Sequence, residues 1–129
     1  MIGVELAVEL RDAGVVWEPA VGDHFTIPDR DLDELTFVLS DMIVQLHELP
    51  RGTVIGFNGT TEWAMDDVEL EEALWLPRED QLRGMLGDAF RRLERGTTGY
   101  RVVVDGRPDG YGATPEEAYA RAVLAALAR

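Results

Sequence analysis

The stretch YRVVVDGRPDGYGATPEEA, residues 100–118, decides the fold class that we predict for this chain. Its first part, 100–105, is rich in β-branched residues and predicts a strand, and 106–110 supplies a turn to a short returning strand at 111–113. Residues 114–117, Thr-Pro-Glu-Glu, then have the pattern of a capping box at a helix start. The packing face expected for this helix consists of Ala118, Ala122, Val123 and Ala126.

Two earlier segments have helical periodicity. Residues 2–13 alternate apolar and acidic positions at helical spacing, and Gly14 follows as a stop. A longer helix is predicted from Pro77 to Gly96, with acids at its start and three arginines near its end, as the helix macrodipole favours. Its apolar stripe comprises Leu82, Met85, Leu86, Ala89, Phe90 and Leu93.

The segments between these helices predict strands and loops. Residues 24–27 are typical of a short strand, and 28–34 of a charged loop. A β-rich run follows at 36–47, with a break at Ser40-Asp41, and 53–57 predicts a further strand.

Asn58-Gly59 is the strongest hairpin signal, because both central residues of a type I′ turn have positive φ. Residues 60–65 fit a strand leaving this turn or a short helix. The acidic residues 66–72 are ambiguous and also fit one helical turn. Together these elements predict an α+β fold: one antiparallel sheet of about four to six strands, with three helices packed mainly on one face. We expect a single domain over residues 1–129.

The bulk composition suits such a domain. The chain has 129 residues, of which 46% are hydrophobic, enough to bury a core at that length. No run approaches the roughly 18 apolar residues of a membrane-spanning helix, and the acidic N-terminal segment differs from a secretory signal. We therefore expect a cytoplasmic protein without a membrane partner.

Two residue types are missing from the sequence, and each absence excludes a class of chemistry. There is no cysteine, which excludes disulfides, thiolate metal sites and thiol nucleophiles. All 12 basic residues are arginine, which excludes a Walker A phosphate loop, Schiff-base catalysis and a lysine general base. We expect no cofactor.

Negative charge is concentrated in the first part of the chain. The net charge is −13, with 17 acids and 3 arginines in residues 1–75 but 8 acids and 9 arginines in residues 76–129. A field of that sign repels nucleic-acid phosphates. We therefore expect a protein partner or self-association, for example a homodimer, and no nucleic-acid partner.

The candidate metal ligands are Asp29, Asp31 and Asp33, which copy the opening of an EF-hand loop. The copy ends there, because Glu34 replaces the required glycine and Ser40 replaces the final glutamate. A solvated loop is the better interpretation, and weak binding of a divalent cation stays open.

Neither histidine nor serine forms a catalytic motif. His24 and His47 lie in predicted strands outside any paired metal spacing. Ser40, the one serine, is followed by Asp41 but lacks the glycines of a nucleophile elbow. We predict no catalytic residue.

The candidate binding residues surround one tryptophan. Trp63 follows Glu62 and the hairpin residue Asn58, and these could form a polar-rimmed pocket with Arg78. The alternative for each tryptophan is burial in the core, which suits Trp75 in particular because it directly precedes Leu76-Pro77.

Two runs carry a resemblance to a known family. Residues 58–66 (NGTTEWAMD) and 74–82 (LWLPREDQL) resemble a family of small, largely uncharacterised actinobacterial proteins, and the second run is similar to segments of small phage-encoded proteins. The resemblance spans most of the chain and implies no known catalytic residue. Some members carry a pilus-assembly label, which does not suit this sequence, because pilus ATPases need a phosphate loop and this chain has no lysine.

The end of the chain carries a second resemblance. Residues 100–105, 110–111 and 113–118 are similar to the strand, strand and capped helix of HicB-type antitoxins. This resemblance covers about the last 30 residues, and it does not include the DNA-binding tail that some antitoxins add.

The leading functional hypothesis is a noncatalytic interaction module of the bacterial cytoplasm with an acidic binding face. One alternative is an antitoxin or a DNA-mimic-like inhibitor. The other is a small metal-dependent hydrolase or ligand-binding enzyme that uses carboxylates. Its candidate residues are Asp29, Asp31, Asp33, Asp41, Glu62 and Asp66.

Overall fold

A computed structural model describes residues 1–28, 32–39, 44–49, 52–57, 67–69 and 72–128. The chain divides into two compact units. The terminal unit comprises Met1–Trp17 and Leu76–Arg129, and the central unit comprises Glu18–Trp75. The single domain predicted over residues 1–129 is not tested by this division and stays a prediction.

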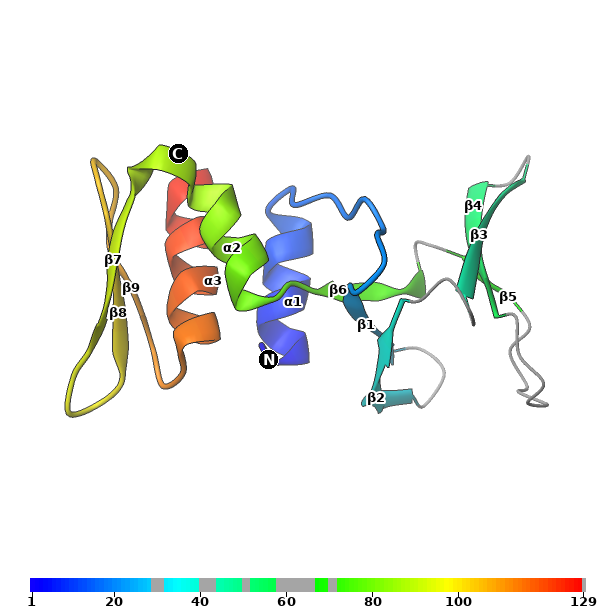
Figure 1. The fold of residues 1–129 in the computed structure, drawn as a ribbon, viewed down its shortest axis with the longest axis horizontal. Coiled ribbons are helices and arrows are strands. Elements are labelled where there is room, and N and C mark those ends of the chain that lie inside the picture. Colours follow the sequence, from blue (N-terminus) through cyan, green and yellow to red (C-terminus); the bar gives the residue numbers. More distant parts are fainter. Residues whose placement is uncertain (29–31, 40–43, 50–51, 58–66, 70–71, 129) are drawn as a thin grey trace. The chain divides into compact units, whose positions relative to one another are not determined.

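Short helices and strands follow one another along the chain (Figure 1). In sequence order the elements are α1 (Val4–Asp12), β1 (His24–Ile27), β2 (Leu32–Val38), β3 (Val44–Leu49), β4 (Gly52–Phe57), β5 (Asp67–Glu69), β6 (Leu74–Leu76), α2 (Glu79–Leu86), the 3₁₀ turn η3 (Gly87–Ala89), β7 (Phe90–Arg95), β8 (Tyr100–Val104), β9 (Gly110–Gly112) and α3 (Pro115–Leu127).

The predicted α+β class is confirmed, with antiparallel strands and three α-helices in the described part of the chain. The strands form three three-stranded sheets, ordered β2-β1-β6, β3-β4-β5 and β7-β8-β9, where the sequence predicted one larger sheet. In the terminal unit, all three helices lie on one side of the β7-β8-β9 sheet, as predicted (Figure 1).

Alternation along β8 builds part of the core of the terminal unit. Val102 and Val104 are buried while Arg101 before them is exposed, because successive residues of a strand face opposite sides. Tyr119 of α3 is also buried, and its ring lies 5.5 Å from that of Phe90. Each large buried side chain stabilises such a core by about 1.5–3 kcal/mol.

Two glycines let α3 approach β9 closely. A Cβ added at Gly110 would lie 2.1 Å from the carbonyl oxygen of Ala118, and one at Gly112 would lie 2.5 Å from the Cβ of Glu117. Both distances are far shorter than van der Waals contact. The helix contributes small buried residues to this contact, Ala118 and Ala122, which the sequence predicted.

The start of α3 is held by the predicted cap. Thr114 Oγ1 accepts a hydrogen bond of 3.2 Å from the backbone N of Glu117, and Pro115 occupies a first-turn position that needs no amide donor. The Glu117 carboxylate accepts a bond of 3.0 Å from the backbone N of Ala113, one residue before the cap. The threonine half of the capping box is therefore confirmed, and the glutamate half is displaced by one residue.

The helix predicted from Pro77 to Gly96 is wrong in its second half. α2 ends at Leu86, Gly87 follows with a left-handed φ of 58°, and the 3₁₀ turn η3 leads into strand β7. Gly84 and Gly87 both lie inside the predicted helix, and each weakens a helix by about 1 kcal/mol relative to alanine.

The arginines predicted at the end of that helix belong to β7 instead. Arg91 forms an ion pair with Asp105, and Arg92 pairs with Glu94 at 3.4 Å. Their positive charge therefore stabilises contacts on and beside a sheet rather than a helix terminus.

The central unit confirms the predicted strand 24–27, which is β1. β2 pairs antiparallel with β1 and begins at Leu32, so the end of the predicted loop 28–34 is a strand. The rings of Phe25 and Phe37 stack across this pair with centroids 5.4 Å apart.

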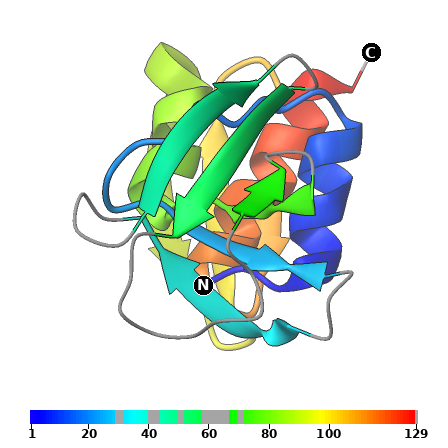
Figure 2. The same ribbon diagram turned by 90° about the vertical axis from the view of Figure 1, so that its right-hand side faces the viewer.

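β3 and β4 run side by side as an antiparallel pair (Figure 2). β4 pairs next with β5, so part of the acidic segment 66–72 forms a strand rather than a helical turn. The predicted Asn58-Gly59 turn and the strand or helix predicted at 60–65 lie outside the described residues.

Over the described ranges, none of the helices has the length and apolar character needed to cross a bilayer.

Replacing Gly110 with alanine should destabilise the protein by about 1–3 kcal/mol, the usual range for overpacking. The added Cβ would collide with the backbone of α3, as described above. Gly84→Ala is the matched control, because nothing lies within 4 Å of a Cβ added there and alanine favours the helix by about 1 kcal/mol. Urea unfolding followed by circular dichroism measures both variants. A Gly110→Ala protein as stable as the wild type would contradict the close packing.

Candidate functional site

Only one of the four residues predicted to form a binding pocket lies in the described part of the chain. That residue is Arg78, directly before α2. The other three, Asn58, Glu62 and Trp63, lie outside the described residues, so their pocket stays a prediction.

Arg78 contacts the first turn of α2. Its backbone N donates to Gln81 Oε1 at 2.9 Å, and its guanidinium Nε donates to Asp80 Oδ1 at 3.0 Å. The second hydrogen bond lowers the pKa of the Asp80 carboxyl below its ordinary value. These contacts give Arg78 a role in starting the helix.

Within the described residues, the structure does not bring the predicted metal ligands together. Asp33 belongs to β2, whereas Asp29 and Asp31 lie outside the described residues, as do Ser40, Asp41 and Asp66. Within the described ranges, no group of three or more histidines or acids could hold a metal ion. Both histidines occupy strands, as predicted, with His24 in β1 and His47 in β3.

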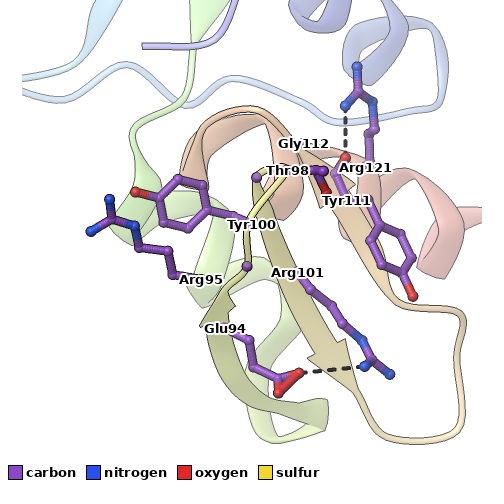
Figure 3. Close-up of a pocket in the computed structure, with 10 residues that line it drawn as sticks. Glu94, Arg95, Thr98, Tyr100, Arg101, Tyr111, Gly112 and Arg121 are labelled. Carbon is purple, nitrogen blue, oxygen red and sulfur yellow. Dashed lines mark hydrogen bonds and ion pairs between the residues drawn. The ribbon is translucent and has the colours of Figure 1, made fainter.

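A hollow of about 530 Å³ opens at the end of the β7-β8-β9 sheet, around the turn that joins β7 to β8 (Figure 3). We call it the arginine hollow. It is lined by Glu94, Arg95, Gly96, Thr98, Gly99, Tyr100, Arg101, Tyr111, Gly112 and Arg121.

Arg101 lies at the centre of a row of side chains that crosses the sheet. The strand register places Glu94 opposite Arg101 and Arg101 opposite Tyr111, so all three share one face. The Arg101 Cζ lies 5.9 Å from the centroid of the Tyr111 ring, a cation–π distance. Its Nε and Nη2 contact Asp109 Oδ2 at 2.8 and 2.6 Å, and its Nη1 lies 3.6 Å from Glu94 Oε1.

Arg121 reaches from α3 to the backbone of the edge strand β9. Its Nη1 donates to the carbonyl oxygen of Tyr111 at 2.7 Å and lies 3.7 Å from Glu117 Oε2. Figure 3 shows the guanidinium of Arg121 joined to this carbonyl by a dashed line. The guanidinium therefore binds a carbonyl at a sheet edge, where such groups would otherwise lack a partner.

Arg95 and Tyr100 lie at the same end of the sheet as Arg101, on its opposite face. They are register partners, one position along from the row of Arg101, and neighbouring positions of a strand face opposite sides. Arg95 is exposed and forms no ion pair within the described part of the chain. Its charge is therefore available to a ligand.

The turn between β7 and β8 depends on glycine. The backbone N of Gly96 donates to the carbonyl of Gly99 at 2.7 Å. Gly99 has a φ of 147°, and a Cβ there would lie 2.4 Å from the carbonyl oxygen of Gly112. Close contact between the turn and β9 thus keeps the wall of the hollow compact.

The lining is suited to binding an anion. It contains three guanidiniums and one carboxylate, with two tyrosine rings and the hydroxyl of Thr98. Guanidinium groups bind carboxylates and phosphates through planar, charge-assisted hydrogen bonds.

The arginine hollow was not predicted from the sequence. Arg95 was expected at a helix end, away from Arg101, whereas it lies in β7. The available signal was the glycine pair Gly96 and Gly99, which brackets a tight turn, together with Tyr111 on the returning strand.

No protein-family model, no curated protein and no solved structure matches this chain.

The pKa of Asp109 gives a test of the Arg101 contact. The Arg101 hydrogen bond lowers this pKa, so Arg101→Gln should raise it toward the ordinary value of an aspartate. A depressed folded-state pKa contributes stability above the unfolded pKa, and that contribution is lost as the pH falls through the folded pKa. A carboxyl ¹³C NMR titration measures the shift.

Arg107→Gln is the control for this titration. Arg107 lies near Asp109 between β8 and β9, is exposed, and has no ion pair within the described ranges. Its replacement should leave the Asp109 titration unchanged. An Arg101→Gln variant in which Asp109 titrates as in the wild type would show that the contact does not persist in solution.

Proposed function

We propose that the protein is a noncatalytic interaction module whose acidic central unit binds a basic protein surface. The observation that carries this proposal is the separation of charge between the two units. The central unit has 14 acids and 2 arginines, a net charge of −12, whereas the terminal unit has 11 acids and 10 arginines, a net charge of −1.

The boundary between the units coincides with the change in charge. Counted along the sequence alone, residues 1–75 carry −14, but α1 contributes acids that belong to the nearly neutral terminal unit. Almost all of the net charge then falls in 58 consecutive residues, 18–75. Charge concentrated in this way attracts a cationic partner from a distance and accelerates association.

A location in the bacterial cytoplasm forms part of the same proposal. It follows from the resemblance of residues 58–66 and 74–82 to small actinobacterial and phage-encoded proteins. The negative field of the central unit also disfavours nucleic acid as the partner.

Neutralising acids of the central unit should weaken partner binding. The test variant is Asp29→Asn/Asp31→Asn/Asp33→Asn, which removes three negative charges from that unit. Immobilised wild-type and variant proteins are compared for capture of basic proteins from a bacterial lysate, quantified by mass spectrometry. Capture by the wild type should fall steeply between about 0.05 and 0.5 M salt, because screening removes the attraction.

The control removes the same number of charges from the terminal unit. It is Glu5→Gln/Glu9→Gln/Asp12→Asn, all in α1, and it should leave capture close to the wild-type level. Equal losses of capture in both variants would show that only the net charge of the whole chain matters. That result would contradict a specific role of the central unit. Capture that does not depend on salt would contradict the proposal as a whole.

A further inference from the structure

We propose that the arginine hollow binds an acidic segment from the central unit of a second copy of this chain. The inference rests on the proposed function, because the same acidic unit acts as the ligand. It names the surface that receives this unit and identifies the partner as another copy of the protein.

The hollow gathers cations from three different elements. Arg95 comes from β7, Arg101 from β8 and Arg121 from α3, and Glu94 is the one acid in the lining. The lining has a formal charge of +2, and two further acids, Asp109 and Glu117, lie against Arg101 and Arg121. Arg95, which forms no ion pair within the described part of the chain, therefore supplies the uncompensated positive charge that attracts an anionic ligand.

The guanidiniums keep donors available for an incoming carboxylate. The side chains of Arg101 and Arg121 are 45% and 49% exposed. Arg101 directs Nε and Nη2 at Asp109, but its Nη1 is 3.6 Å from Glu94, longer than a normal hydrogen bond. Exposed ion pairs contribute little free energy, so a new carboxylate can share this group.

The aromatic residues suit a protein ligand. Tyr111 is 58% exposed and lies against the Arg101 guanidinium. Tyrosine and arginine are the residues enriched at the energetic centres of protein interfaces. A volume of about 530 Å³ is within the range of ligand pockets and holds a few side chains of a peptide segment.

Charge complementarity selects the occupant. The central unit carries −12 and has only two arginines, and a second copy supplies it at the same concentration as the hollow. Its densest acidic run is DDVELEE, residues 66–72, with five carboxylates in seven residues. We assign this run to the hollow because it alternates acids with apolar residues, as the lining combines guanidiniums with tyrosine rings.

Sedimentation velocity of the full chain at low salt tests the inference. The wild type should self-associate, and Arg95→Gln/Arg121→Gln should raise the dissociation constant about tenfold or more, since each lost charge pair weakens association. The control Arg11→Gln/Arg107→Gln removes the same charge from exposed positions of the terminal unit outside the hollow, and it should associate as the wild type does.

A labelled peptide identifies the segment that binds. Fluorescent DDVELEE should bind the full chain and compete with self-association, whereas NNVQLQQ, the same run without charge, should not bind. The variant Arg95→Gln/Arg121→Gln should bind the peptide about tenfold more weakly than the wild type does. The single variant Arg95→Gln, which removes no ion pair within the described part of the chain, should show the same change to a smaller degree and controls for misfolding caused by the change at Arg121.

The outcomes separate this inference from the proposed function. A monomeric wild type that does not bind DDVELEE overturns the inference, while capture of basic proteins from the lysate would still support the proposed function. Self-association that persists in Arg95→Gln/Arg121→Gln also overturns it. Association lost in that variant, with no capture of a foreign protein, supports the second copy as the partner and counts against a foreign one.

Discussion

The close approach of α3 to β9 is the constraint on which the terminal unit depends. Gly110 and Gly112 leave room for the backbone of the helix, and no other residue type could stand at either position without displacing it. Because α3 lies so near, Thr114 can begin the helix two residues after β9 ends, and Arg121 can reach the Tyr111 carbonyl about two helical turns later. The packing and the position of the third guanidinium of the arginine hollow thus have the same origin.

The terminal unit is nearly neutral because it has 10 arginines for its 11 acids. Several of these arginines lie next to acids of the same unit, as Arg91 lies next to Asp105 and Arg101 next to Asp109, whereas Arg95 forms no ion pair within the described part of the chain. The central unit has too few arginines for such pairing. Most of its negative charge must be balanced by solvent ions or by another molecule, which links the distribution of charge to association.

Local signals in the sequence were sufficient for some elements and insufficient for others. The strand β8 and the cap at Thr114 were predicted because β-branched residues and a threonine three positions before a glutamate act over a few residues. β7 was not predicted, because its apolar residues also fit helical spacing. What decides its structure is the left-handed turn at Gly87 and pairing with a strand that comes later in the chain. The arginine hollow depends on that register, so the error about β7 concealed it.

The division of the chain also has a consequence for its synthesis. The terminal unit is assembled from two segments that are far apart in the sequence, and α1 contacts α3, so α1 must wait for α3 to be made before it can pack. The ribosome produces the whole central unit after α1 and before α3. For the folding of the terminal unit, the central unit is therefore one long loop. Since the entropy of closing a loop grows only with the logarithm of its length, this inserted segment can change in size at little thermodynamic cost to the unit that surrounds it. New binding properties can therefore evolve in the inserted segment while α1, α3 and the sheet stay as they are.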